Sequence, residues 1–322
     1  MSKQASFPFN QFLHPRFWLL WLGLGFLRLL AVVPFRLQLI CGRGLGWLMY
    51  IAIPYRRRIG AINLELCFPE LSNQQRSQLL REHFSAAGIS MIETAISWWA
   101  SDNQLKPLHQ IEGIEHLEAA RENGRGVLLM SAHFTTLEIG GRLLSLHTPF
   151  EVMYRKHNNP LFEAVMLRSR QSHYSNVHER RSVRNIAKSL KAGNTVWYAP
   201  DQDYGRKQSI FAPFFGVPTA TITATARFAK ISGAAVVPFF QERLKDGSGY
   251  RLRILPEIEN YPTGDDVADA TTINAIIEAE VRQYPEQYLW VHRRFKTRPE
   301  GLARPYPSRN RQGRRKRHSD VA

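Results

Sequence analysis

Residues Gly126 to Arg142, GVLLMSAHFTTLEIGGR, contain the features that decide the fold. Val127–Met130 is a short, wholly apolar run, which is typical of a buried strand. Small and polar residues carrying His133 follow it, and a helical pattern begins at Thr135. This order predicts a strand that ends close to His133 and a helix that starts from the same point. Ligands of open α/β sheets bind outside the carboxyl ends of the strands, so His133 is a candidate site residue.

Glu138 follows His133 by five residues and is the first candidate for its partner. On one continuous helix the two side chains would diverge by about 140°. They converge only if His133 lies in the turn and Glu138 in the first helical turn. There the carboxylate would orient the imidazole and leave its other nitrogen free to accept a proton. We therefore predict His133 as a general base and Glu138 as its orienting partner.

Two simpler explanations of this pair stay open. A histidine followed five residues later by an acid is expected by chance in a chain with 11 His and 27 acidic residues. Thr135 and Glu138 also have the spacing of a capping box, in which the acid bonds the N-cap backbone. The local sequence alone does not separate a catalytic pair from an ordinary helix start.

The composition restricts the partners of the chain. Its 322 residues are enough to bury a substantial core, and its net charge of +16 favours anionic partners. Nucleic acid, acidic lipid headgroups and a phosphorylated substrate all fit this charge. The two cysteines, Cys41 and Cys67, suggest neither a disulfide framework nor a zinc site. A mean hydropathy of −0.31 argues against a polytopic membrane protein.

The N-terminal region predicts a membrane anchor. Residues 1–16 lack the features of a signal peptide. Phe17–Val33 contains one charge, Arg28, and its 17 residues are at the short end for crossing a bilayer. We expect a single-pass anchor helix over 17–36, with the body of the protein in the cytoplasm because basic residues follow it. The alternative is a helix buried in the core or lying in the membrane interface.

Beyond the anchor, the patterns predict an α/β domain over 37–303. A long amphipathic helix, or two shorter ones, begins at a capping box formed by Ser72 and Gln75. Strand signals then fall at 108–112, 127–131, 150–155, 195–198, 234–240 and 250–255. Helical signals fall at 114–122, 135–147, 159–172, 182–192, 221–232 and 268–283. This alternation predicts a mostly parallel sheet covered by helices on both faces. Residues 304–322, rich in Arg and Pro, predict a disordered basic tail.

The chemistry of the chain is limited by the motifs that it lacks. There is no G-x-S-x-G nucleophile elbow, no phosphate-binding loop of the G-x-x-x-x-G-K-[ST] type and no H-E-x-x-H metal motif. The histidines show no metal-ligand spacing, and we expect neither a metal nor a cofactor. A histidine paired with a carboxylate is then best suited to deprotonate a hydroxyl, in a direct transfer without a covalent enzyme intermediate.

Four separated blocks resemble the lipid A biosynthesis acyltransferases of Gram-negative bacteria, most closely the lauroyl-type branch. They are SAHFTTLEIGGR at 131–142, YAPDQDYGRKQSIFAPFFG at 198–216, NLELCFPE at 63–70 and PEQYLWVHRRFKTRPEG at 285–301. The resemblance implies a glycerolipid-acyltransferase-like α/β fold anchored in the inner membrane. It also implies transfer of a fatty acyl chain, expected to be lauroyl, from acyl carrier protein to a hydroxyl of a lipid A precursor, Kdo2-lipid IVA.

The family pattern implies that Asp201 and Arg170 complete the site. Asp201 follows a predicted strand, so a parallel sheet would bring it to the same edge as His133, although Asp201 and Asp203 also fit simple turn positions. Arg170 would bind a phosphate or the developing thioester oxyanion, unless it is an ordinary solvated charge. Arg155, at the end of another strand, is a weaker candidate for the same role.

The excess of Lys and Arg over acidic residues would bind an anionic inner-membrane surface, and no nucleic acid partner is expected. Two rival functions stay open. The nearer rival is a glycerolipid or lysophospholipid acyltransferase with the same chemistry. The other is a membrane-tethered protein that binds nucleic acid or anionic lipid through 304–322.

Overall fold

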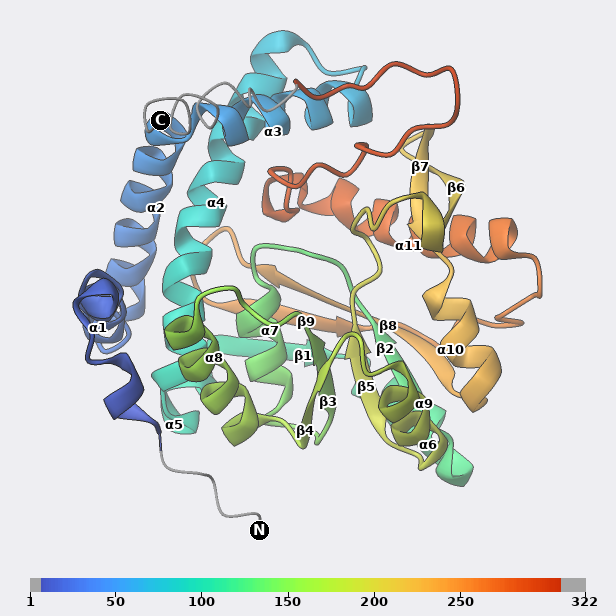
Figure 1. The fold of residues 1–322 in the computed structure, drawn as a ribbon, viewed down its shortest axis with the longest axis horizontal. Helices are drawn as coiled ribbons and strands as arrows, with labels where there is room; N and C mark the ends of the chain where they lie inside the picture. The colour runs from blue at the N-terminus through green and yellow to red at the C-terminus, as the bar shows by residue number, and fades with distance from the viewer. Residues whose placement is uncertain (1–6, 308–322) are drawn as a thin grey trace, which may run out of the picture.

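A seven-stranded sheet forms the centre of the molecule in the computed structural model, which describes residues 7–307 (Figure 1). The strand order is β1-β9-β8-β2-β5-β3-β4. All neighbouring strands are parallel except β8 and β9. The strands are β1 (His109–Glu112), β2 (Val127–Met130), β3 (Glu151–Tyr154), β4 (Asn176–Glu179), β5 (Thr195–Tyr198), β8 (Ala235–Arg243) and β9 (Tyr250–Ile254). The predicted α/β class with a mostly parallel sheet is confirmed.

β2 lies at the middle of this sheet, and its position explains its sequence. All four of its residues are buried, because β8 and β5 flank it and helices cover both faces. Leu128 and Met130 belong to one core cluster, whereas Val127 and Leu129 belong to the other. A strand that is buried on both faces has no polar positions, so its apolar run is continuous.

Helices that alternate with the strands form the two covering layers. One core cluster takes apolar residues from α9 (Val183–Lys191), α10 (Ala224–Ser232) and α11 (Asp266–Gln283). The other takes them from α6 (Ile114–Arg121), α7 (Leu137–Leu144) and the C-terminal half of α4 (Asn73–Trp99). α8 (Pro160–His173) leads from β3 to β4, and the short α5 (Asp102–Leu105) follows α4.

The N-terminal third of the chain packs as helices beside the sheet (Figure 1). These are α1 (Trp18–Leu30), α2 (Phe35–Ala52), α3 (Pro54–Cys67) and α4, whose predicted capping box is present. α2 crosses α4 closely, and a Cβ added to Gly46 would lie 2.2 Å from the carbonyl oxygen of Phe84. A Cβ on Gly88 would meet the backbone nitrogen of Gly46 at the same distance. Gly42, Gly46 and Gly88 therefore allow this close helix crossing.

The structure does not support the predicted single-pass anchor over 17–36. α1 has 13 residues and is therefore about 20 Å long, whereas the hydrocarbon core of a bilayer is about 30 Å thick. In residues 7–307, no single helix combines the length and the apolar composition needed to cross a membrane. α2 and α3 have enough of both only when taken together, and they meet at a bend of 95°.

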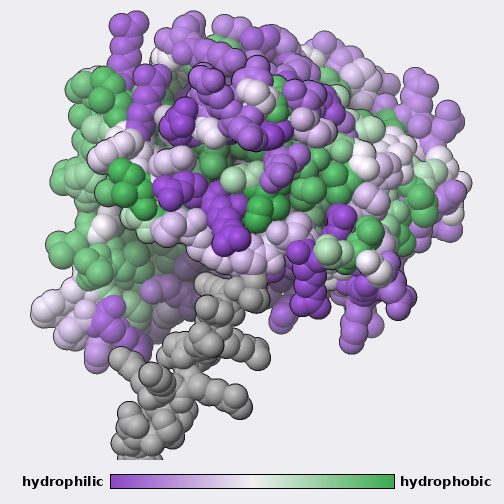
Figure 2. All heavy atoms as spheres, turned by 90° about the horizontal axis from the view of Figure 1, so that it is seen from above, coloured by the Kyte–Doolittle hydropathy of each residue, from purple (hydrophilic) through white to green (hydrophobic). Residues whose placement is uncertain are grey.

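Many apolar side chains of α1 and α2 are nevertheless exposed. Figure 2 shows them along the side of the molecule on which Figure 1 places these helices. We call this surface the apolar face, and it includes Leu19, Leu22, Phe26, Leu29, Ile40, Trp47 and Ile51. Leu19 is 82% exposed and Trp47 66%. Apolar side chains of this size rarely gather on the surface of a protein unless they contact a partner or a membrane.

Two segments differ from the predicted pattern. β6 (Ser209–Phe214) and β7 (Val217–Ile222) form a separate antiparallel hairpin, in which Phe214 and Phe215 are buried core residues. In the predicted tail, Tyr306 is buried and bonds Asn63, so the folded part extends beyond residue 304. The rest of that tail, 308–322, lies outside the described residues.

Candidate active site

His133 lies in the loop that joins β2 to α7, as the strand–turn–helix pattern predicts. The segment around Tyr288 holds this loop in place. Leu289 donates its backbone N–H to the carbonyl of His133 at 3.0 Å, and the carbonyl of Gln287 accepts from the N–H of Thr135 at 2.7 Å. The loop is therefore fixed by backbone hydrogen bonds at His133 itself and at Thr135, two residues further on.

Asp201 is the carboxylate that contacts the imidazole. β5 pairs in parallel with β2, with Tyr198 opposite Met130, so the loops after both strands begin at the same edge of the sheet. The Nδ1 of His133 lies 2.5 Å from Oδ1 of Asp201, and the backbone N–H of His133 donates to Oδ2 at 3.0 Å. The Tyr288 hydroxyl also donates to Oδ2, at 3.0 Å. With Nδ1 engaged, Nε2 is the nitrogen that remains for a substrate.

The predicted contact between Glu138 and His133 is therefore wrong. Glu138 lies in the first turn of α7, as expected, but its carboxylate accepts from Arg170 at 2.5 and 3.1 Å and from the indole of Trp98 at 3.0 Å. It faces α4 and α8, which carry those partners. Nor does a capping box form, because the N-cap of α7 is Thr136 and makes no side-chain cap bond.

The electrostatics support two separate pairs. Burial alone would raise the pKa of Asp201, but the charge of His133 and hydrogen bonds from its ring and backbone outweigh this effect and lower the pKa well below its usual range. Burial would also raise the pKa of Glu138, and the guanidinium of Arg170 reverses that shift. Both carboxylates are thus held in the ionised form.

The other predicted residues occupy different positions. Arg155 is exposed just after β3. Asp203 does not contact His133, because its carboxylate accepts from the N–H of Gly205 at 2.9 Å and from the N–H and hydroxyl of Thr297 at 2.8 and 2.9 Å. It stabilises the loop, so of the two acids after β5 only Asp201 belongs to the site.

Three residues of the site were missed by the sequence analysis. Tyr288 bonds Asp201, and Trp98 bonds Glu138. Burial lowers the pKa of His292, whose ring lies near Asp201 and His133, to about 4. Tyr288 and His292 fall in the block at 285–301 that carries the family resemblance, which was the available signal. Trp98 lies in an amphipathic helix and gave none.

An apolar cavity of about 370 Å³ adjoins this site. His292 and Leu289 line one side of it, and Phe84 and Ala87 of α4 line another. Leu289 is the residue whose N–H bonds the carbonyl of His133. The volume lies within the usual range for small-molecule sites, and the imidazole that lines the cavity is that of His292.

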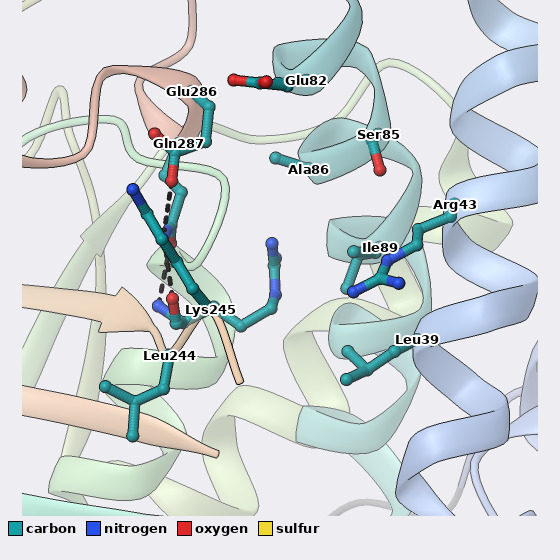
Figure 3. A pocket seen from close by; sticks show the side chains of 11 residues that line it. Leu39, Arg43, Glu82, Ser85, Ala86, Ile89, Leu244, Lys245, Glu286 and Gln287 are labelled. Carbon is teal, nitrogen blue, oxygen red and sulfur yellow. Dashed lines mark hydrogen bonds between the residues drawn. The ribbon is translucent and has the colours of Figure 1, made fainter. Parts of the chain in front are cut away.

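A different cavity, of about 280 Å³, lies between α2, α4 and the end of β8 (Figure 3). Figure 3 shows the Gln287 side chain in its wall, bonded to the backbone of Arg243 at 2.8 and 3.0 Å. None of His133, Asp201 and Glu138 lines this cavity, so it is not part of the candidate site. The Gln287 bonds in its wall instead fix the segment that holds the His133 loop.

Within residues 7–307, no three or more His, Cys, Asp or Glu side chains form a group that could hold a metal ion.

A histidine held by a buried carboxylate at the carboxyl edge of an α/β sheet can act as a general base. The family model described as bacterial lipid A biosynthesis acyltransferase matches residues 8–297. The chain belongs to this family and is an acyltransferase.

Relatives from Escherichia coli (strain K12) cover nearly the whole chain. Its lipid A biosynthesis palmitoleoyltransferase is 43% identical over 95% of this chain and 100% of its own length. Its lipid A biosynthesis lauroyltransferase is 40% identical over 91% of this chain and 96% of its own length. A solved structure, the LPA acyltransferase PlsC from Thermotoga maritima, is 12% identical over 77% of this chain and 97% of its own, with a TM-score of 0.37.

Proposed function

We propose that His133 is the general base that activates the acceptor hydroxyl of a lipid A precursor. Nε2 removes the hydroxyl proton, the oxygen attacks the carbonyl carbon of an acyl thioester, and the C–S bond breaks. The proton then passes from Nε2 to the departing thiolate. Asp201 orients the ring and stabilises the imidazolium that forms, which is the role of a buried acid in such pairs. The observation that carries this proposal is the contact of 2.5 Å between His133 and Asp201.

Arg170 and Arg155 are the proposed substrate-binding cations. Arg170 is fixed by Glu138 on the α8 side of the site, so its guanidinium is preorganised for an oxyanion or a phosphate. Glu138 acts in this scheme by positioning Arg170, not by orienting His133.

The proposed acyl donor is acyl carrier protein, an acidic partner. Arg155 and Lys156 follow β3, and Arg180 and Arg181 follow β4, so four cations lie at the same sheet edge as His133. We call these residues the basic rim. A concentration of one charge near a site attracts partners of the opposite charge and speeds their association.

The proposed location is the cytoplasmic side of the inner membrane of a Gram-negative bacterium. The apolar face of α1 and α2 would lie in the membrane interface, in the manner of helices that lie in the plane of a bilayer. The basic residues of the chain would add attraction to anionic lipid, about 1 kcal/mol for each Lys or Arg near the surface.

Acyl transfer with two acceptors tests the function. Purified enzyme receives lauroyl and palmitoleoyl thioesters of acyl carrier protein, with either Kdo2-lipid IVA or a lysophospholipid as acceptor. We expect product on the lipid A precursor, and its mass gives the preferred chain. Product on the lysophospholipid alone would instead establish the rival glycerolipid activity. Since relatives of 43% and 40% identity bear different acyl names, the lauroyl expectation depends on this measurement.

A further inference from the structure

A third, larger cavity lies between α1, the C-terminal end of α4 and α8, and the proposed mechanism does not use it. Its volume is about 680 Å³. Its apolar wall consists mainly of aromatic rings, those of Phe7, Phe9, Trp21, Trp98 and Trp99. The volume and the apolar lining are those of a site for a molecule of substantial size.

Both charged side chains that line this cavity are cationic. Arg28 lies 5.7 Å from the ring of Trp99, and Arg168 lies 6.0 Å from the ring of Phe7. Within residues 7–307, neither guanidinium has a carboxylate within ion-pair distance, so their positive charge is held by rings and remains available to an anion.

A buried hydroxyl in the same cavity also has no partner. Ser169 is 9% exposed, and its Oγ makes no hydrogen bond within the described part of the chain. A buried hydroxyl without a partner costs free energy, which a ligand that bonds to it would recover. This observation is independent of the two arginines and also indicates an amphiphilic occupant.

Residues that line the cavity also contact the candidate site or lie next to the apolar face. Trp98 lines it and bonds Glu138, and Ser169 directly precedes Arg170. On its other side, Leu24 and Gly25 of α1 line the cavity, while Leu22 and Phe26 of the same helix are exposed on the apolar face. One helix thus separates the cavity from the surface that we propose to contact the membrane.

We infer that this cavity binds the acceptor lipid, with one acyl chain among the aromatic rings and an anionic group at Arg28 and Arg168. This inference rests on the proposed function. The acceptor is favoured over the donor because the cations lie next to the apolar wall, which suits an amphiphile whose charge is close to its chains. In an acyl thioester the chain begins at a neutral carbonyl.

Filling the cavity from α1 tests this assignment. A Cβ on Gly25 would meet nothing within 4 Å, and neither would one on Gly23 of the same helix. Only Gly25 lines the cavity, so Gly25→Phe occupies it and Gly23→Phe is the matched control. We expect Gly25→Phe to raise the KM for the lipid A precursor about tenfold, as loss of a well-placed chain would, with the donor KM unchanged. Gly23→Phe should behave like the wild type.

Removing the two arginine charges tests whether the cavity binds an anionic group of the acceptor lipid. The Arg28→Gln/Arg168→Gln double variant should raise the acceptor KM about tenfold for the phosphorylated precursor and leave it unchanged for a dephosphorylated one. Arg184→Gln, an exposed arginine on α9 that does not line the cavity, is the control.

Three outcomes would overturn the inference while acyl transfer by the wild type remains intact. The first is an unchanged acceptor KM in Gly25→Phe. The second is a changed donor chain-length profile in that variant, which would assign the cavity to the donor chain. The third is an equal effect of the arginine double variant on both acceptors. Absence of acyl transfer by the wild type would count against the proposed function itself.

Discussion

The imidazole of His133 meets the carboxylate of Asp201 at 2.5 Å, although the two residues are 68 positions apart in the sequence. Parallel pairing of β2 and β5 causes this meeting, because both residues follow their strand at the same sheet edge. Glu138, only five positions from His133, bonds Arg170 instead. The proposed chemistry therefore depends on sheet topology and not on the local spacing.

Asp201→Asn should lower kcat by about 10²–10⁴, because the ring would lose the acid that selects its tautomer and stabilises its positive charge. The pKa of Asp201 is depressed, so the carboxylate stays ionised throughout the working pH range. Loss of this negative charge beside the general base should move the acid limb of the kcat/KM profile to lower pH. Steady-state rates between pH 5 and 9 measure both effects.

Glu138→Gln is the control for that experiment. Its carboxylate belongs to Arg170 and Trp98, so the acid limb should stay where it is in the wild type. A shift of the limb in Glu138→Gln and none in Asp201→Asn would restore Glu138 as the orienting residue and refute the assignment made here.

Arg170→Gln should destabilise the fold by about 1–3 kcal/mol, because it leaves the partly buried charge of Glu138 without its cationic partner. Glu138→Gln/Arg170→Gln should recover part of this loss, since no charge then remains in the pair. Urea denaturation of both single variants and of the double variant gives the coupling energy. Strict additivity would mean that the pair contributes nothing, and Arg184→Gln controls for loss of an arginine as such.

Much of the fold was predictable because strand and helix periods are local properties. The six predicted strands and six alternating helices all occur, since each has an apolar run or face that the sheet buries. β4 was missed because NVHE, an edge strand, contains one apolar residue among polar ones. The predicted anchor over 17–36 failed because composition shows that a segment is apolar but does not show where its helix ends.

The candidate site was predictable only in part, for a related reason. The family resemblance named Asp201, and the parallel-sheet rule, which needs no side-chain detail, placed it at the same edge as His133. The partner of Glu138 depends on how α8 and the end of α4 pack against α7, which brings Arg170 and Trp98 to the carboxylate. Contacts of this kind are long-range, and no spacing in a single sequence encodes them.

Gly46→Ala should destabilise the protein by about 1–3 kcal/mol, the usual cost of overpacking. Its new Cβ would lie 2.2 Å from the backbone of Phe84, and neither helix can yield without losing the crossing. Gly44→Ala, in the same helix, meets nothing within 4 Å and should instead stabilise by about 1 kcal/mol through helix propensity. Thermal unfolding of the two variants distinguishes them, and equal effects would refute the proposed role of the glycine at 46.

Stability should fall as the pH is lowered below 6.5, and buried histidines should cause much of the fall. Burial lowers the pKa of His83 from 6.5 to about 4. Between these values the unfolded chain binds a proton that the folded chain does not, so the stability lost at pH 5 is about 2 kcal/mol for this residue. His83→Gln removes the titrating group, and its loss of unfolding free energy between pH 7 and pH 5 should be smaller than that of the wild type by that amount. Urea denaturation at both pH values measures this difference, with His14→Gln, an exposed histidine, as the control. An equal loss in His83→Gln and the wild type would show that His83 is already protonated in the folded protein at pH 5, contrary to its buried position.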